Sequence, residues 1–388
     1  MLKIDIAERR NWKGLAKELG FHFHTIEGAP YWKEAAYYQF TLTQVENDIE
    51  APTEALHELC MAMVERVCHS DELMRRLALP EYMWETIRRS WAEGQPHLYG
   101  RMDFAYDGNG PAKLLELNYD TPTSIYEAGF FQWVWLEQAI QQGLIPRQAD
   151  QYNSIQERLL NVMAHLGQRL EDATLHFSCV KDNVEERATV HYLQDIAVQA
   201  GLKAPFVFMQ DIGLNPGMTH FVDLDDNPIR AIFKLYPWEE MAHDTFGEQL
   251  PAMQTHWFEP PWKAILSNKG ILPLLWKYNE GHPNLLPAFF DDDPSQPLPP
   301  GWVRKPFFSR EGSNIELVTD AGEREFVDGP YTDSPYIRQA YQPMPKFGDQ
   351  HALIGSWVVG DRACGMGIRE DSGKITKDTS CFIPHAIV

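Results

Sequence analysis

Four polar residues, two on each side of a predicted turn at residues 107–110, have the types and spacing of a metal-binding and phosphoryl-transfer site. Arg101 and Asp103 are two residues apart, as are Glu116 and Asn118. In a β-strand, side chains at i and i+2 point to the same face. The Asp-Gly-Asn-Gly turn between two extended runs predicts a hairpin. If Asp103 lies opposite Glu116 in that hairpin, Arg101 falls opposite Asn118, and all four side chains share one face.

The shared face has the ligands that Mg²⁺ prefers. Two carboxylates and an amide oxygen are hard oxygen donors, and Mg²⁺ takes few protein ligands and completes its octahedron with phosphate and water. A guanidinium beside the metal, that of Arg101, can hold a transferring phosphoryl group. A solvated hairpin face with a salt bridge would use the same residues, so the spacing alone leaves both interpretations open.

A second set of residues, the basic side chains of the last third of the chain, could hold the phosphates of ATP. These phosphates need several convergent cations, and a Ser-Arg-Glu-Gly-Ser loop starting at Ser309 can add backbone N–H groups. Each cation could equally be a solvated strand end, and charge placement alone does not select the ligands. The candidates are Lys263, Lys269, Arg304, Lys305, Arg310, Arg338 and Arg369.

The elements that must position these residues are a mixture of helices and strands, so the sequence predicts an α+β fold. Apolar periodicity predicts helices in 46–93, 125–142 and 152–170. Extended runs and turn residues predict a β-α-β unit over 174–210, hairpins over 220–236 and 352–368, and a strand-rich final hundred residues. The Asp- and Pro-rich segment 291–301 is the best candidate for a surface loop.

Composition limits the partners. A 44% hydrophobic and 12% aromatic chain is globular. With 34 Lys and Arg against 55 Asp and Glu, the formal net charge is −21, which argues against nucleic acid or an anionic membrane as the main partner. Five cysteines without a C-x-x-C pair, no leader-like start and no long apolar run predict reduced thiols in a cytoplasmic protein without a membrane span. The oligomeric state is not predicted.

Five segments of the chain together resemble one enzyme family, the synthetase domain of glutathionylspermidine synthetase and trypanothione synthetase. The family's separate amidase domain has no counterpart in this sequence, so the chain resembles the stand-alone relatives described as acid–amine ligases. The resemblance implies an ATP-grasp fold, in which two α+β lobes clamp the nucleotide. The segments are YWKEAAYYQFTLTQVENDIEAPTEALHE (31–58), LLELNYDTPTSIYEAGFFQW (114–133), EPPWKAILSNKGILPLLW (259–276), FSREGSNIELV (308–318) and IRQAYQPMPKF (337–347).

The resemblance implies one synthetase unit over residues 1–388 and roles for particular residues. Its approximate parts are 1–95 (N-terminal, helical), 96–255 (metal and substrate) and 256–388 (nucleotide). The implied magnesium ligands are Asp103, Glu116 and Asn118. The implied catalytic arginines are Arg101, as transition-state stabiliser, with Arg310 and Arg369 near the phosphates and the acid. The implied ATP contacts are Arg101, Met102, Asp103, Lys269, Lys305, Gly312, Gln339, Ala340, Tyr341, Gln342, Lys374, Ile375 and Thr376.

The chain departs from the family pattern where the substrates would bind. After Glu-Leu-Asn the family reads Ala-Asp-Ser, whereas here residues 119–124 read Tyr-Asp-Thr-Pro-Thr-Ser, so Thr121 and Thr123 keep hydroxyls in a different context. Glu185 and Glu186 match a Glu-Glu pair that lines the family's substrate site, and two carboxylates would favour a cationic amine. Acidic residues in a first helical turn also complement the helix dipole, which is the alternative.

The predicted function is that of an ATP-dependent carboxylate–amine ligase. A carboxylate and an amine only form a salt at neutral pH, so ATP must first make the acid electrophilic as an acyl phosphate. The implied cofactors are ATP and two Mg²⁺ ions, and the implied partners are a small peptide-like acid and a cationic amine. The alternatives are another ATP-grasp phosphoryl-transfer enzyme, such as a kinase or amino-acid ligase, and a nucleotide-binding protein without turnover.

Overall fold

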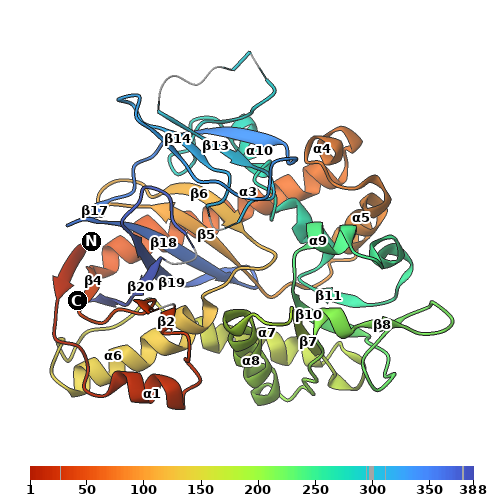
Figure 1. The fold of residues 1–388 in the computed structure, drawn as a ribbon, viewed down its shortest axis with the longest axis horizontal. Helices are drawn as coiled ribbons and strands as arrows, with labels where there is room; N and C mark the ends of the chain where they lie inside the picture. Colours follow the sequence, from red (N-terminus) through yellow and green to blue (C-terminus); the bar gives the residue numbers. More distant parts are fainter. Residues whose placement is uncertain (27, 294, 297–300, 311, 378–379) are drawn as a thin grey trace.

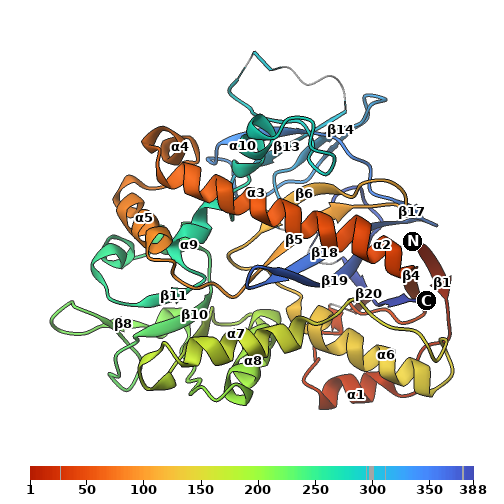
Figure 2. The same ribbon diagram turned by 180° about the vertical axis from the view of Figure 1, so that it is seen from behind.

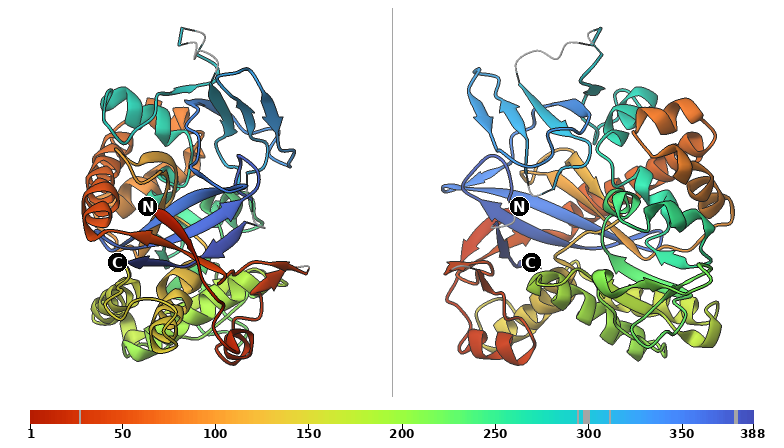
Figure 3. Two further views of the ribbon diagram at one scale, coloured as in Figure 1. Left: turned by 90° about the vertical axis from the view of Figure 1, so that its left-hand side faces the viewer. Right: turned by 45° about the vertical axis from the view of Figure 1, so that its right-hand side comes forward.

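The protein, as a computed structural model, combines helices with sheets on several levels (Figure 1). The structure describes residues 1–26, 28–293, 295–296, 301–310, 312–377 and 380–388. The five-stranded sheet and α10 lie above the central six-stranded sheet in Figure 1, and α6, α7 and α8 lie below it. Figure 3 shows the same levels from two further directions. The predicted mixture of helices and strands is confirmed.

The central sheet brings together strands from distant parts of the chain. Its antiparallel order is β20-β19-β18-β5-β6, with β17 paired to β18. The hairpin predicted over 352–368 forms as β18 and β19, and the hairpin around residues 107–110 forms as β5 and β6. The bounds are β5 Tyr99–Ala105, β6 Lys113–Asn118, β17 Lys346–Phe347, β18 Gln350–Val359, β19 Arg362–Asp371 and β20 Cys381–Ile383.

The second large sheet is antiparallel and has the order β12-β16-β13-β14-β15. It confirms the strands expected in the final hundred residues. Its bounds are β12 Ala288–Phe290, β13 Trp302–Pro306, β14 Glu316–Val318, β15 Arg324–Phe326 and β16 Tyr336–Ala340.

Among the residues that the structure describes, four smaller sheets complete the fold. β11-β10-β7 is parallel, β1-β4-β21 brings segments from both ends of the chain together, and β2-β3 and β8-β9 are short antiparallel pairs. The bounds are β1 Leu2–Asp5, β2 Thr25–Ile26, β3 Ala29–Pro30, β4 Ala36–Phe40, β7 His176–Cys179, β8 Gly213–Leu214, β9 Phe221–Val222, β10 Ala231–Leu235, β11 His256–Phe258 and β21 His385–Ile387.

Helices form in each segment predicted to be helical, and α1, α2, α9 and α10 lie outside those segments. Figure 2 shows the longest, α3, running across the back of the central sheet. In the part of the chain described, no helix is both long and apolar enough to cross a membrane. The α-helices are α1 Trp12–Glu18, α2 Leu42–Gln44, α3 Ala51–Cys68, α4 Asp71–Arg76, α5 Trp84–Ala92, α6 Gln132–Gln141, α7 Ile155–Gly167, α8 Val184–Gln199, α9 Trp238–His243 and α10 Ile271–Tyr278, and π-helical turns at Val45–Glu50 and Glu127–Phe131 lead into α3 and α6.

Local sequence explains where these helices begin and which face they bury. In α3, Leu56, Cys60 and Val64 recur at helical spacing and are fully buried, so this stripe fixes the helix on the sheet. α8 begins at Asn183, whose side chain accepts a hydrogen bond from the Glu186 N–H at 3.0 Å. This cap orients the first turn of α8, which carries the predicted acidic pair.

Three predicted elements differ in the structure. Residues 205–210 do not form the second strand of a β-α-β unit: they run beside β7 through isolated bridges, since Pro205 has no N–H to continue the ladder. The hairpin over 220–236 is closed by its turn, but β9 pairs with β8 while β10 joins β7 and β11. Of the surface loop expected at 291–301, residues 294 and 297–300 lie outside the described residues.

Candidate active site

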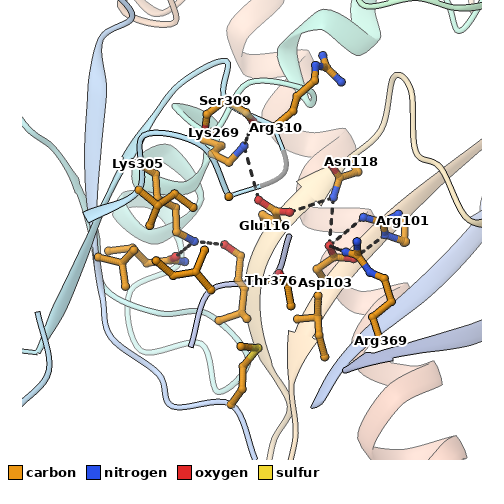
Figure 4. A pocket seen from close by; sticks show the side chains of 18 of the residues that line it. Arg101, Asp103, Glu116, Asn118, Lys269, Lys305, Ser309, Arg310, Arg369 and Thr376 are labelled. Carbon is orange, nitrogen blue, oxygen red and sulfur yellow. Dashed lines mark hydrogen bonds and ion pairs between the residues drawn. The ribbon is translucent and has the colours of Figure 1, made fainter. Parts of the chain in front are cut away.

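A cavity between the two large sheets brings together almost all the residues predicted to act. The six-stranded sheet contributes side chains of β5, β6, β18 and β19, and the five-stranded sheet contributes β13, β14 and β16. Figure 4 shows carboxylates of the central sheet facing Lys305 of the five-stranded sheet and Lys269, which lies just before α10. The predicted site residues that line it are Arg101, Asp103, Glu116, Asn118, Thr121, Thr123, Glu186, Lys269, Lys305, Arg310, Gly312, Gln339, Ala340, Tyr341, Gln342, Arg369, Lys374, Ile375 and Thr376.

The hairpin register predicted from residue spacing is confirmed. Asp103 pairs with Glu116 and Arg101 pairs with Asn118. The register then shifts by one residue, because Phe104 pairs with Leu114 and leaves Leu115 as the extra residue of a bulge. The Leu115 carbonyl accepts a hydrogen bond from Lys305 Nζ at 3.0 Å. The bulge therefore links the β5–β6 hairpin to the opposite sheet.

Arg101 and Asp103 form a bidentate ion pair on β5. The distances are 2.6 Å from Arg101 Nε to Asp103 Oδ1 and 2.9 Å from Nη2 to Oδ2. Nη1 donates to the Thr123 carbonyl at 2.8 Å, and Arg369 Nη2 lies 3.4 Å from Asp103 Oδ2. Burial alone would lower the pKa of the Arg101 guanidinium. The charge of the adjacent Asp103 and its hydrogen bonds together raise that pKa above its ordinary value. Two arginines thus converge on one carboxylate at the cavity wall (Figure 4).

Glu116 lies between the hairpin and the lysines. Its Oε2 is 3.5 Å from Lys269 Nζ. Burial would raise the pKa of Glu116, but Lys269, Lys305 and Arg101 together lower it to about 2. Glu116 is therefore a permanent carboxylate at any pH at which the protein would work.

The donor set of this face fits Mg²⁺. Asp103 and Glu116 supply two carboxylates, and in the described residues no group of three or more His, Cys, Asp or Glu could hold a metal by itself. A cation here must therefore draw on few protein ligands and on phosphate or water, which is what Mg²⁺ does. Asn118 Nδ2 is 3.4 Å from Asp103 Oδ2 and 3.4 Å from Glu116 Oε1, so its amide would turn to present the oxygen to a metal.

The two predicted lysines approach from the other side of the cavity. Lys269 Nζ donates to the Ser309 carbonyl at 2.5 Å, and Lys305 Nζ donates to Gln339 Oε1 at 2.8 Å. Burial lowers the pKa of Lys305 to about 8, although the nearby Glu116 carboxylate acts to raise it. An anion placed between these ammonium groups would supply charge that the protein alone does not fully provide.

The loop after β13 covers one end of the cavity. Arg310 Nη1 donates to Thr121 Oγ1 at 2.8 Å, and its Nη2 forms an ion pair with Glu239. Gly312 has φ +73°, and a Cβ there would lie 2.7 Å from the Thr376 carbonyl oxygen. Glycine is therefore required both for the backbone conformation and for the close approach of segment 375–376.

Two predicted contacts lie elsewhere. The side chain of Met102 is fully buried in the core on the opposite face of β5 and does not line the cavity, so the expected ATP contact of this residue stays a prediction. Successive side chains of a strand point to opposite faces, and Arg101 and Asp103 on either side of Met102 face the cavity, so the Met102 side chain faces the core. Glu186 lines the cavity and Glu185 does not, since consecutive helical residues point about 100° apart.

Sequence reasoning missed the apolar wall of the cavity and one partner of a catalytic candidate. The wall is next to the Gln339–Gln342 segment and offers a surface for a flat ring. Its signal was present at Val303, two residues before Lys305 on the same strand, whereas the Glu239 partner of Arg310 had no local signal. The wall residues are Leu115, Val303, Ile315, Leu317, Met344 and Leu353.

The chain is similar to known proteins along most of its length. Residues 3–388 match the family described as "Glutathionylspermidine synthase preATP-grasp". A Haemophilus influenzae protein described as a "putative acid–amine ligase" is 38% identical over 95% of both chains. Trypanothione synthetase of Crithidia fasciculata is 30% identical over 84% of this chain, and the bifunctional glutathionylspermidine synthetase/amidase of Escherichia coli is 25% identical over 91%.

The extent of these matches differs between relatives. The chain spans 53% of the length of the trypanothione synthetase and 60% of the bifunctional enzyme. Among solved structures, a glutathione synthetase-like effector from Globodera pallida superposes with a TM-score of 0.55 at 12% identity, covering 91% of this chain and 89% of that one. At this identity the likeness shows a shared fold.

Proposed function

Because the chain belongs to the glutathionylspermidine synthase family, whose relatives named above are ligases or synthetases, we propose that it uses ATP to join a carboxylic acid to an amine. One observation carries the proposal. The carboxylate face of Asp103 and Glu116 and the cations Lys269, Lys305 and Arg369 converge on one cavity. That combination suits a nucleotide triphosphate with its metal.

We assign the fold to the ATP-grasp type, with the nucleotide between the two large sheets. The apolar wall around Val303 and Leu317 would receive the adenine, and the Gln339–Gln342 segment supplies backbone and side-chain polar groups at its edge. Lys269 and Lys305 would pair with the phosphates. These roles follow from position, because each group lines the space between the sheets.

The reaction divides between charge neutralisation and positioning. The acid's carboxylate oxygen attacks the γ-phosphorus of ATP, and the bond between that phosphorus and the bridging oxygen to the β-phosphate breaks. ADP departs, and the acid is then an acyl phosphate. The amine nitrogen, in its neutral form, then attacks the acyl carbon, the bond from that carbon to the phosphate oxygen breaks, inorganic phosphate leaves, and the nitrogen loses one proton to water. Arg101 holds the transferring phosphoryl group, and Arg369 and Arg310 hold the acid. Mg²⁺ held by Asp103, Glu116 and Asn118 would offset charge on the phosphate oxygens. No protein nucleophile is needed.

Glu186 favours a cationic acceptor. It lines the cavity from the first turn of α8, and Glu185 precedes it in the same turn. A protonated amine group would gain from this carboxylate, whereas a free amino acid would bring a carboxylate of its own. A diamine or polyamine is therefore the proposed acceptor class.

A coupled assay of ADP release, run across a matrix of peptides, amino acids and polyamines, tests the function. Release that requires both an acid and an amine, with an amide product seen by mass spectrometry, is the expected result. Release with an acid alone and a stable phosphorylated product would indicate a kinase instead. Nucleotide binding without ADP release under any combination would refute a catalytic role.

A further inference from the structure

Asp120 and Lys234 form a buried ion pair next to the candidate site, and within the described part of the chain no hydrogen bond or ion pair joins it to Asp103, Glu116, Lys269 or Lys305. Both side chains are fully buried, and Lys234 Nζ lies 2.6 Å from Asp120 Oδ1. Lys234 is on β10 of the parallel sheet, and Asp120 follows β6 of the central sheet. Breaking a buried pair leaves an uncompensated charge, so such a pair fixes the elements that carry it.

The pair connects two segments, and each segment supplies one residue that contacts Arg310. Lys234 Nζ also donates to the Tyr236 carbonyl at 2.9 Å, and the second oxygen of Asp120 accepts from the Trp238 N–H at 2.8 Å. The residue after Asp120 is Thr121, and the residue after Trp238 is Glu239. These two residues are the ones that hold the Arg310 guanidinium.

We infer that Asp120 and Lys234 are positioning residues that set the place of Arg310. Thr121 approaches Arg310 from the central sheet and Glu239 from the start of α9, and the Asp120 carboxylate is the shared anchor of both. In Figure 4 the Arg310 side chain lies apart from the cluster around Asp103. Its orientation therefore depends on these outer partners rather than on the carboxylates of the metal face. The effect expected on the rate of ADP release rests on the proposed function, whereas the effect expected on the position of Arg310 does not.

Asp120→Asn is the most direct perturbation. An Asn side chain offers one oxygen, so its NH₂ group must face either the Lys234 ammonium or the Trp238 N–H, which are both donors. Glu34→Gln is the matched control, because Glu34 also belongs to a fully buried ion pair, with Arg9, in a different part of the chain. Both variants lose a buried pair, and only the Asp120–Lys234 pair belongs to the segments that carry the partners of Arg310.

Limited trypsin digestion of the full chain reads the position of Arg310 without any substrate. A held guanidinium resists insertion into the protease, so Asp120→Asn should raise cleavage after Arg310 about tenfold, while Glu34→Gln should leave it at the wild-type rate at equal global stability. Equal cleavage after Arg310 in Asp120→Asn and wild type overturns the inference. If Asp120→Asn does not fold, the charge-neutral pair Asp120→Asn with Lys234→Met carries the same test and the same expectation.

A double-mutant cycle reads the kinetic consequence. Asp120→Asn should lower the rate of ADP release in the wild-type background and have no further effect in an Arg310→Ala background. An equal loss in both backgrounds would mean that Asp120 acts independently of Arg310, which overturns the inference. If the wild-type chain releases no ADP with any acid and amine, the proposed function fails, and the trypsin result still decides the positioning role.

Discussion

Lys305 gives a sharp test of the nucleotide site, because its charge changes within an accessible pH range. Burial lowers its pKa from 10.5 to about 8. At about 1.4 kcal/mol per pH unit, holding the ammonium charged costs the ligand-free protein about 3 kcal/mol relative to an ordinary lysine. A bound phosphate would restore the missing countercharge and bring the pKa back towards 10.5. Nucleotide binding and protonation of Lys305 should therefore be linked.

The expected affinity follows from the fraction of Lys305 that is charged before binding. With a pKa of about 8, that fraction is about nine-tenths at pH 7 and about one-tenth at pH 9. The affinity for MgADP should thus be nearly constant below pH 7.5 and about tenfold weaker at pH 9. Isothermal titration calorimetry or tryptophan fluorescence across pH 6.5–9.5 measures it.

The folding stability of the ligand-free protein should move in the opposite direction. Between pH 8 and 10.5 the unfolded chain still holds the Lys305 proton, whereas the folded chain has lost it. More protons on the unfolded state mean that stability rises with pH across this window, by about 3 kcal/mol from this group. Thermal unfolding with and without MgADP should therefore show a ligand-induced shift that shrinks as pH rises.

Two variants separate Lys305 from other titrating groups. Lys305→Arg stays charged throughout, so its MgADP affinity should be flat from pH 7 to pH 9. Lys305→Met should bind weakly at every pH. A wild-type affinity that is flat across this range, or a Lys305→Arg affinity that falls in the same way, would refute the assignment of Lys305 to the phosphates.

The other predictions concern the metal, the phosphoryl group and the acceptor. Asp103→Asn and Glu116→Gln should each lower the rate of ADP release by about a hundredfold or more with the circular dichroism spectrum intact; near-normal rates in both at saturating Mg²⁺ would remove the metal assignment. Arg101→Lys should lower kcat by about a hundredfold and change the KM for ATP little, and a change confined to that KM would make Arg101 a ground-state contact. Replacing both Glu185 and Glu186 by Gln should raise the acceptor KM about tenfold at low salt and less at high salt, with the ATP KM unchanged; an unchanged acceptor KM would leave the pair as a helix start.

The hairpin at residues 99–118 shows what sequence can predict and why. A strand alternates with period two and an antiparallel register keeps a constant index sum, so the spacing of four residues is enough to predict their shared face. The one-residue bulge at Leu115 was not predictable from the hairpin itself. The carbonyl of Leu115 accepts a hydrogen bond from Lys305, which comes from another sheet and lies far away in the sequence.

The errors have the same physical origin. The segment 205–210 has strand-forming residues, but β10 rather than this segment became the regular partner of β7. Likewise the turn at 225–228 formed as expected, while β9 and β10 found different sheets. Local propensity predicts that a strand or turn exists, and the choice of partner is decided by packing between distant elements. The Asp120–Lys234 pair likewise depends on packing between distant elements and could not be predicted from local sequence.

The pairing of β5 with β18 has a consequence for how the protein acquires activity during synthesis. Gly355 lies opposite Asp103, so the strand that carries Arg101 and Asp103 finds its second neighbour, β18, only about 250 residues later in the chain. Contacts of such long range carry a large loop-closure cost and form late in folding. A nascent chain that has left the ribosome as far as β6 holds every proposed magnesium ligand and still lacks the neighbouring strand β18. We therefore expect nucleotide binding to arise only after β18 and β19 have emerged.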